Sequence, residues 1–132
     1  MAVLVDTNVI SDVMHGDPVW KPWAESQLAA HAGGLIINPF IYAELCCRAR
    51  SAPELDLALA MLGLEFEDRS RGTLFLAAQA FLRYRKRGGS ERAPLPDFFI
   101  GAHAEAHGVP ILTRDVGRYR TYFPTVQLIC PG

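Results

Sequence analysis

The sequence predicts an α/β fold in which helices flank a mostly parallel central sheet. Three short apolar runs, at residues 2–5, 35–37 and 110–112, show no alternation of apolar and polar residues, which suits strands buried on both faces of such a sheet. Longer segments with helical periodicity separate these runs. The length of 132 residues fits one domain, residues 1–132, with a single core.

Each element follows from local signals. The first strand is followed by Asp6 and then by a helix that Thr7 or Asn8 can cap. Asn38-Pro39 predicts another helix start, with Asn38 as the N-cap and proline at the first helical position. Glycine and proline bound most of the other segments. The remaining predicted elements are a helix at 19–32, a strand at 35–37, a helix after Pro39, a helix at 53–62, a strand at 64–66, a helix at 73–87, a polar loop at 88–96, a helix from 96 that Gly108 ends, and strands at 110–112 and 126–129.

Two later helices have predicted core faces set by helical spacing. In the helix at 73–87 the inward positions are Leu74, Ala77, Ala78, Phe81 and Leu82. In the helix that begins at 96 they are Phe98, Phe99, Ala102 and Ala106.

Charge is distributed unevenly along the chain. The net charge is −1, but residues 1–68 hold ten acidic and three basic residues, whereas residues 69–132 hold ten basic and four acidic ones. Such asymmetry indicates a polyanionic partner, unless the two halves neutralise each other across the fold. No run is long enough to span a membrane and no targeting segment begins the sequence, so we expect a cytoplasmic protein without membrane contact. The three cysteines form no CxxC pair and are expected to be buried free thiols.

Four acidic residues are predicted to lie near the same edge of the sheet, at the carboxyl ends of its strands. Asp6 ends the first strand, Glu44 lies in the early turns of the helix after the second, Asp97 begins a helix, and Asp115 follows a late strand. In open α/β sheets the chemistry lies beyond the carboxyl ends of the strands. Each pair of carboxylates at ~4 Å repels by about 4 kcal/mol at an effective dielectric near 20, so a cluster requires protons or divalent cations. Oxygen ligands alone select Mg²⁺ or Mn²⁺. Taken alone, Asp6 can also be explained as a helix cap.

Other catalytic motifs are not supported. His103 and His107 have the spacing of zinc ligands, but Glu105 does not directly follow the first histidine as it does in zinc proteases, so packing and surface roles are expected. No glycine-rich loop follows the first strand, which excludes dinucleotide and P-loop sites.

The residues around the four acids resemble the PIN domain family. The resemblance rests on Leu4-Val5-Asp6-Thr7-Asn8, Tyr42-Ala43-Glu44-Leu45, Leu95-Pro96-Asp97 and Ile111-Leu112-Thr113-Arg114-Asp115, and it covers nearly the whole chain. Within that family, the length and the C-terminal segment resemble VapC toxins. One departure is Gly101, where the family usually has alanine or a larger apolar residue; glycine there weakens the helix by up to ~1 kcal/mol.

The resemblance implies a Mg²⁺- or Mn²⁺-dependent endoribonuclease that cleaves single-stranded RNA, forms a homodimer and is inhibited by a small VapB-like antitoxin. The expected metal ligands are Asp6, Asp97 and Asp115, and Glu44 is expected to be a water-mediated ligand or to orient and deprotonate the nucleophilic water. Supporting or substrate contacts are expected from Asn8, Thr113 and Arg114. The expected RNA-backbone contacts are Arg83, Arg85 and Arg87, although basic residues in a last helical turn also complement the helix dipole.

Three alternatives remain open at this point. The chain can be a housekeeping PIN nuclease without a toxin role, a PIN module that binds RNA or protein, or a metal-dependent phosphatase acting on small phosphoesters. The four acids argue against a pure binding module, because a site without catalysis gains nothing from their repulsion.

Overall fold

The computed structural model describes residues 1–68, 71–87 and 95–132. Its described strands form one five-stranded sheet in the order β3-β2-β1-β4-β5, and every pairing is parallel. The strands are β1 (Val3–Val5), β2 (Leu35–Ile37), β3 (Glu65–Phe66), β4 (Ile111–Leu112) and β5 (Leu128–Ile129). The helices are α1 (Thr7–Met14), α2 (Lys21–Ala30), α3 (Pro39–Cys46), α4 (Ala52–Met61), α5 (Arg71–Lys86), α6 (Leu95–His107) and α7 (Gly117–Tyr122).

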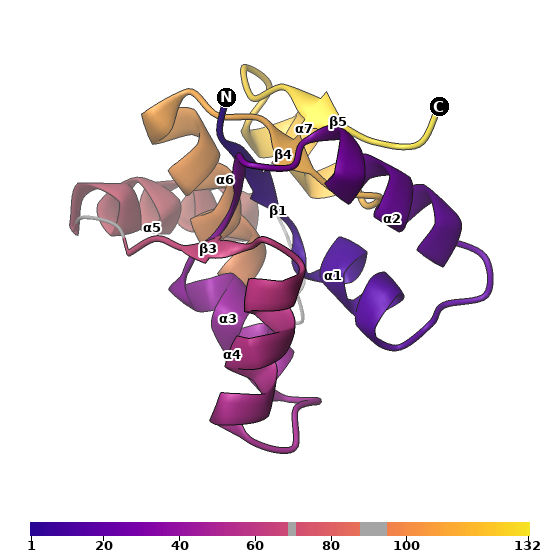
Figure 1. Ribbon diagram of the computed structural model, residues 1–132. Coiled ribbons are helices and arrows are strands. Elements are labelled where there is room, and N and C mark those ends of the chain that lie inside the picture. The colour runs from indigo at the N-terminus through magenta and orange to yellow at the C-terminus, as the bar shows by residue number, and fades with distance from the viewer. Residues whose placement is uncertain (69–70, 88–94) are drawn as a thin grey trace.

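Helices cover the sheet on both sides. Figure 1 shows α1 and α2 on one side of the strands and α5 and α6 on the other, with α3 and α4 towards the lower end of the view. The predicted α/β/α arrangement is therefore confirmed. No described helix has the length and apolar character that crossing a bilayer requires.

Strand β1 is the centre of the core. All three of its residues are fully buried, and they pair with β2 on one side and β4 on the other. Leu4 lies opposite Ile36 of β2 and Ile111 of β4. The non-alternating apolar runs are explained by this position, because a central parallel strand has no face exposed to water.

Helix caps fix where the chain turns away from the sheet. Asn38 caps α3 as predicted, and its Oδ1 accepts hydrogen bonds from the amides of Phe40 and Ile41, each 3.0 Å long. The cap of α1 is Asp6, not Thr7 or Asn8: its carboxylate accepts from the Thr7 amide at 2.8 Å. Of the capping residues that the sequence allows, Asp6 is therefore the one observed, and the residue proposed for chemistry also caps the helix.

The predicted inward face of α5 is only partly correct. Ala77 is fully buried, but Leu74 and Leu82 are 37% and 51% exposed. Thr73 and Ala80 are buried instead, so the buried stripe contains smaller side chains than expected. Two aromatic rings of α5 also contact α6: those of Phe81 and Tyr84 lie 5.5 and 5.4 Å from the ring of Phe98 between centres.

Helix α6 is buried around more of its circumference than an amphipathic pattern suggests. Phe98 and Ala102 are buried as predicted, whereas Ala106 is exposed. Ile100, His103 and Ala104 are also buried. The helix lies against α3, α5 and α7, which explains the additional buried positions.

Two further expectations need correction. Cys46 and Cys47 are exposed and Cys130 is half-buried, so the thiols are not core residues. Helix α7 was not predicted, and most of the polar loop expected at 88–96 lies outside the described residues.

Candidate functional site: an acidic cavity at the carboxyl edge of the sheet

The four predicted acids line one cavity of about 300 Å³, which we call the acidic cavity; its lining residues are Asp6, Thr7, Asn8, Glu44, Asp97, Asp115 and Tyr119. They come from the end of β1, from α3, from the first turn of α6 and from the segment after β4. Parallel pairing of β1 with both β2 and β4 places these segments at one edge of the sheet. The topology therefore brings together residues that are up to 109 positions apart in sequence.

Asp6 is 5% exposed and is held by several donors. Its Oδ1 accepts from the Thr7 amide, and its Oδ2 accepts from the hydroxyls of Thr113 and Tyr119, both at 2.9 Å. The side-chain amide of Asn8 lies 3.4 Å from the same Oδ2. The carboxylate is thus fixed in position before any ligand binds.

Burial raises the pKa of Asp6 from its ordinary value of 3.8 to about 6. The hydrogen bonds from Thr113 and Tyr119 act in the opposite direction, and the negative charge of Asp97 raises the pKa further. Burial is the largest of these effects, because a carboxylate removed from water loses hydration that the few donors only partly replace.

Glu44 is linked to the first helix by a short hydrogen bond. The hydroxyl of Thr7 donates to Glu44 Oε1 at 2.7 Å, which joins α1 to α3 across the cavity. Partial burial raises the pKa of Glu44, the Thr7 hydrogen bond lowers it, and the charge of Asp97 raises it again. Asp97 therefore acts electrostatically on both Asp6 and Glu44.

Asn8 and Thr113 hold the Asp6 carboxylate in place through side-chain hydrogen bonds to its Oδ2. Thr113 is fully buried, and it accepts hydrogen bonds from the Asn8 side chain at 3.2 Å and from the Asp115 amide at 3.0 Å. Asn8 Oδ1 accepts from the Arg114 amide at 3.3 Å. Of the two roles expected for Asn8 and Thr113, the geometry favours support of the acids over substrate contact.

Tyr119 is a cavity residue that the sequence did not reveal. It is 2% exposed, and burial and the nearby acids raise the pKa of its phenol well above the ordinary value, so it remains a proton donor to Asp6. It comes from α7, which has six residues, too few for a periodic pattern to be recognised. The only available signal was an aromatic residue four positions after Asp115.

The donors of the acidic cavity suit a hard divalent cation. Carboxylates, a hydroxyl, a side-chain amide and a phenol line it, and the charge of Asp97 raises the pKa of both Asp6 and Glu44. Over the described ranges, no three acidic, histidine or cysteine side chains are grouped closely enough to form a ready-made metal site. The residues present fit Mg²⁺ or Mn²⁺ in donor chemistry, although the acids are not preassembled around one point.

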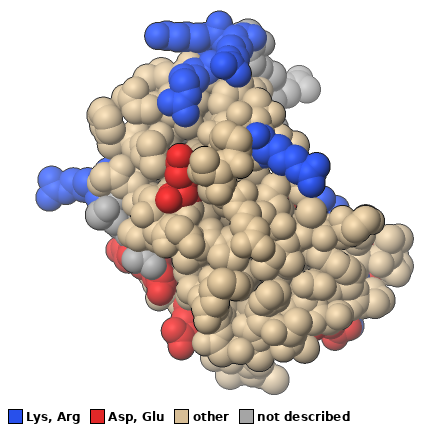
Figure 2. All heavy atoms as spheres, turned by 90° about the horizontal axis from the view of Figure 1, so that it is seen from above, with Lys and Arg blue, Asp and Glu red and all other residues tan. Residues whose placement is uncertain are grey.

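The predicted RNA-binding arginines lie outside the acidic cavity. Arg83, Arg85 and Arg87 are all exposed at the C-terminal end of α5 and just beyond it. The guanidinium of Arg87 lies 5.8 Å from the ring centre of Tyr122, in the same short helix as Tyr119. Figure 2 shows the largest group of lysine and arginine side chains at the top of the face in view, further basic side chains at its left edge and on the right, and acidic side chains between and below them.

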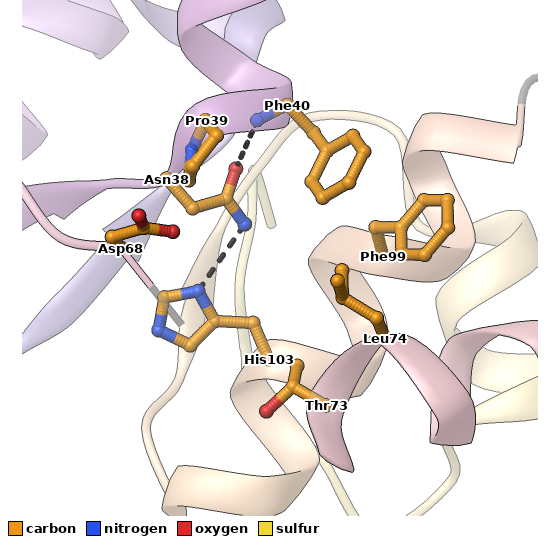
Figure 3. Close-up of a pocket in the computed structure, with 8 residues that line it drawn as sticks. All are labelled: Asn38, Pro39, Phe40, Asp68, Thr73, Leu74, Phe99 and His103. Atoms are coloured by element: carbon orange, nitrogen blue, oxygen red, sulfur yellow. Dashed lines mark hydrogen bonds between the residues drawn. The ribbon is translucent and has the colours of Figure 1, made fainter. Parts of the chain in front are cut away.

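His103 lines a second, largely apolar cavity of about 140 Å³ (Figure 3). Asn38 Oδ1 faces the start of α3, so Asn38 Nδ2 donates to His103 Nδ1 at 3.2 Å. Figure 3 shows the rings of Phe40 and Phe99 on the opposite side of this cavity, where they stack with centres 4.1 Å apart. His103 is 1% exposed, so the packing role predicted for it is confirmed.

His107 does not join it in a zinc site. The imidazole of His107 is exposed and lies 3.4 Å from the Thr73 hydroxyl. The two rings meet edge to face, 5.3 Å apart between centres.

Comparisons with known proteins place this geometry in context. The PIN domain family model matches residues 3–124. A chain of the VapBC2 structure from Rickettsia felis, solved with a promoter DNA fragment, superposes with a TM-score of 0.71 at 18% identity, covering 100% of both chains. A toxin–antitoxin complex from Klebsiella pneumoniae gives a TM-score of 0.73 at 20% identity over 99% of this chain and 98% of that one.

FitAcB from Neisseria gonorrhoeae gives a TM-score of 0.66 at 20% identity over 96% of each chain. No curated protein sequence matches the chain. At these identities the structural matches demonstrate a shared fold.

Proposed function

The chain belongs to the PIN domain family, a family of nucleases, and from this premise we propose that it is a Mg²⁺- or Mn²⁺-dependent endoribonuclease that cleaves single-stranded RNA and acts as the toxin of a toxin–antitoxin pair. The observation that carries the proposal is the convergence of Asp6, Glu44, Asp97 and Asp115 on one cavity. Such a group of carboxylates is costly without a cation and has an evident use in metal-assisted hydrolysis.

In this proposal Asp6, Asp97 and Asp115 hold the metal. When bound, the metal lowers the pKa of a water molecule and offsets the negative charge that develops on the phosphate. Asp6 is fixed for this role by Tyr119 and Thr113.

Glu44 is proposed to orient the attacking water and to accept its proton. Its Oε1 is engaged by Thr7, and partial burial brings its pKa closer to neutrality, as a general base requires.

The RNA backbone is proposed to contact the basic end of α5. Arg83, Arg85 and Arg87 project into solvent, and α7 connects this end of the helix to the acidic cavity through Tyr122 and Tyr119. Phosphate contacts of this kind supply affinity without reading the base sequence.

A protein inhibitor is proposed as the partner, since a ribonuclease with an open cavity would damage the cell that makes it. The structural neighbours include toxin–antitoxin complexes, which supports this assignment. Leu57, Met61 and Phe66 are 63%, 79% and 55% exposed, and they form an apolar surface on α4 and β3 on which a small VapB-like antitoxin can pack. An arginine of the antitoxin would then pair with the acids of the cavity.

We further propose a cytoplasmic homodimer. Phe75 and Leu82 lie seven positions apart on α5 and are 67% and 51% exposed, which places two large apolar side chains on one side of the helix where another copy can pack.

The activity test uses purified protein and total RNA. Incubation with Mg²⁺, Mn²⁺ or EDTA, followed by mapping of the new RNA ends, should give discrete metal-dependent cuts, and Asp97→Asn should abolish them. Asp56→Asn is a matched control, because it makes the same change at an exposed acid outside the acidic cavity. Hydrolysis of p-nitrophenyl phosphate with intact RNA would favour a phosphatase, and RNA binding without cleavage would favour a binding module.

The toxin role is tested separately by expression in cells. Expression alone should arrest growth, and co-expression with the neighbouring small reading frame should restore growth and yield a stable complex in a pull-down. Harmless expression together with RNA cleavage in vitro would identify a housekeeping nuclease.

A further inference from the structure

A polar cavity of about 350 Å³ adjoins the acidic cavity, and Asn8 lines both. We call it the arginine groove and define it by Asn8, Asp12, His15, Asp17, Arg48 and Arg114. It extends from the acidic cavity along α1, with the segment after α1 on one side and the end of α3 on the other.

Arg114 is held rigidly in this groove. Its Nε and Nη2 donate to the two carboxylate oxygens of Asp12, at 2.7 and 3.0 Å, and its guanidinium lies 5.6 Å from the ring centre of Trp20. Asp12 is only 4% exposed, so the pair fixes one edge of the guanidinium. The side chain has five N–H donors, and the Asp12 pair uses two of them.

Arg48 supplies a second guanidinium in the groove. It is exposed, it follows Glu44 by four residues, and in the part of the chain that the structure describes it forms no ion pair. Among the acids of the groove, Asp12 is paired with Arg114, and the Asp17 carboxylate accepts from the amides of Val19 and Trp20 at 2.9 Å each. The donors of Arg48 therefore remain available for an anion from outside.

We propose that the arginine groove binds the phosphodiester of a nucleotide adjacent to the cleaved bond, with Arg48 and the free edge of Arg114 as its ligands. The proposal rests on the ribonuclease function proposed above. An RNA strand in the acidic cavity carries a phosphate on every neighbouring nucleotide, and the groove offers guanidinium donors next to that cavity at Asn8. The groove thus sets the position of the strand, whereas the acids perform the chemistry.

The test combines a protein variant with a chemically altered substrate. A labelled oligoribonucleotide containing a mapped cleavage site is prepared with one phosphate at a time replaced by a neutral methylphosphonate. Wild-type protein, Arg48→Ala, Arg48→Lys and the control Arg50→Ala are compared by kcat and KM. Arg50 is an exposed arginine two residues away that does not line the groove.

We expect Arg48→Ala to raise KM about tenfold with little change in kcat, and Arg50→Ala to behave as wild type. One methylphosphonate close to the cleaved bond should raise KM by a similar factor for the wild type and have no further effect on Arg48→Ala. Arg48→Lys should retain part of the effect, because it keeps the charge but loses the planar fork.

Equal KM values for Arg48→Ala and Arg50→Ala would overturn the proposal. It would also be overturned if Arg48→Ala cleaved RNA normally but escaped the inhibitor, since the groove would then be a protein-binding surface. If the wild type cleaves no RNA, the proposed function fails, and the groove is judged by fluorescence anisotropy of the same oligonucleotide. Equal RNA binding by wild type and Arg48→Ala would overturn the groove as well.

Discussion

The hydroxyl of Tyr119 donates a 2.9 Å hydrogen bond to Oδ2 of Asp6, so a residue from the short helix α7 holds the acid that ends the central strand. Thr113 donates to the same oxygen, whereas Oδ1 accepts from the amide of Thr7. Asp6 is therefore oriented by two hydroxyls that come from segments more than 100 residues away.

Replacement of Tyr119 by phenylalanine should weaken metal binding without unfolding the protein. The variant keeps the buried ring but removes one donor from Asp6, and loss of such a supporting hydrogen bond typically costs about 10- to 100-fold in metal affinity or activity. The measurement is the shift in unfolding temperature as Mn²⁺ is added, together with the Mn²⁺ dependence of RNA cleavage. Tyr122→Phe is the matched control, and identical Mn²⁺ titrations for wild type and Tyr119→Phe would show that the hydroxyl has no such role.

Asp6→Asn should change how stability depends on pH. Burial raises the pKa of Asp6 to about 6, so the folded protein binds this proton more tightly than the unfolded chain does. In metal-free wild type, the contribution of Asp6 to the free energy of unfolding should therefore fall by about 2 kcal/mol as the pH rises from about 4 to 6, and it is lost completely above the folded pKa. Asparagine cannot titrate, so the variant should be at least as stable as wild type at pH 7.5.

Urea unfolding of both proteins in EDTA, from pH 4.5 to 7.5, measures this difference directly. Titrating groups far from Asp6 are common to the two proteins and cancel, so the difference reports Asp6 together with the neighbours that its charge affects. Parallel pH profiles for wild type and Asp6→Asn would contradict the prediction. Added Mg²⁺ should stabilise the wild type more than the variant.

Gly101→Ala should destabilise the protein even though alanine favours helices. A Cβ at this position would clash with the ring of Phe123, a residue that is only 2% exposed. Overpacking of this kind typically costs about 1–3 kcal/mol, which exceeds the ~1 kcal/mol gained in helix propensity. Thermal unfolding of Gly101→Ala, Phe123→Leu and the double variant should show that the smaller side chain relieves the loss; a more stable Gly101→Ala would disprove the contact.

Replacement of Arg83, Arg85 and Arg87 by glutamine should weaken RNA binding and make it less sensitive to salt. If all three contact phosphates, the slope of log affinity against log salt should decrease by about 2 for single-stranded RNA. Fluorescence anisotropy between 50 and 300 mM salt, roughly the range over which such contacts respond, measures the slope. The triple lysine variant should keep it, and an unchanged slope for the glutamine variant would mean that these arginines serve only the helix dipole.

The sequence was sufficient for the fold class and for the approach of the four acids. Buried parallel strands carry uninterrupted apolar runs, and a residue that directly follows such a run lies at the carboxyl edge by construction, as Asp6 does. Less could be predicted where contacts between helices decide the outcome. Leu82 has the spacing of a core residue, yet it is 51% exposed, whereas its neighbour in sequence, Phe81, contacts the ring of Phe98 on α6.

The hydrogen bonds that hold the acids of the site in place could not be predicted from the sequence either. The hydrogen bond from Thr7 to Glu44 joins residues 37 positions apart, and that from Tyr119 to Asp6 joins residues 113 apart. No local pattern encodes such pairs, because they depend on how α3 and α7 pack against the sheet. Gly101 was recognised as unusual, but only its contact with Phe123 shows why a side chain does not fit there.

The order of the strands in space has a consequence for when the protein becomes active during its synthesis. Strand β1 is made first but lies between β2 and β4, and the acidic cavity needs Asp115 and Tyr119, which follow β4. A nascent chain that has not yet released residues 111–119 from the ribosome therefore lacks one side of the cavity. Under the proposed ribonuclease function, such a chain would not yet cleave the messenger from which it is translated, and the proposed inhibitor would be needed only after this last segment has folded into place.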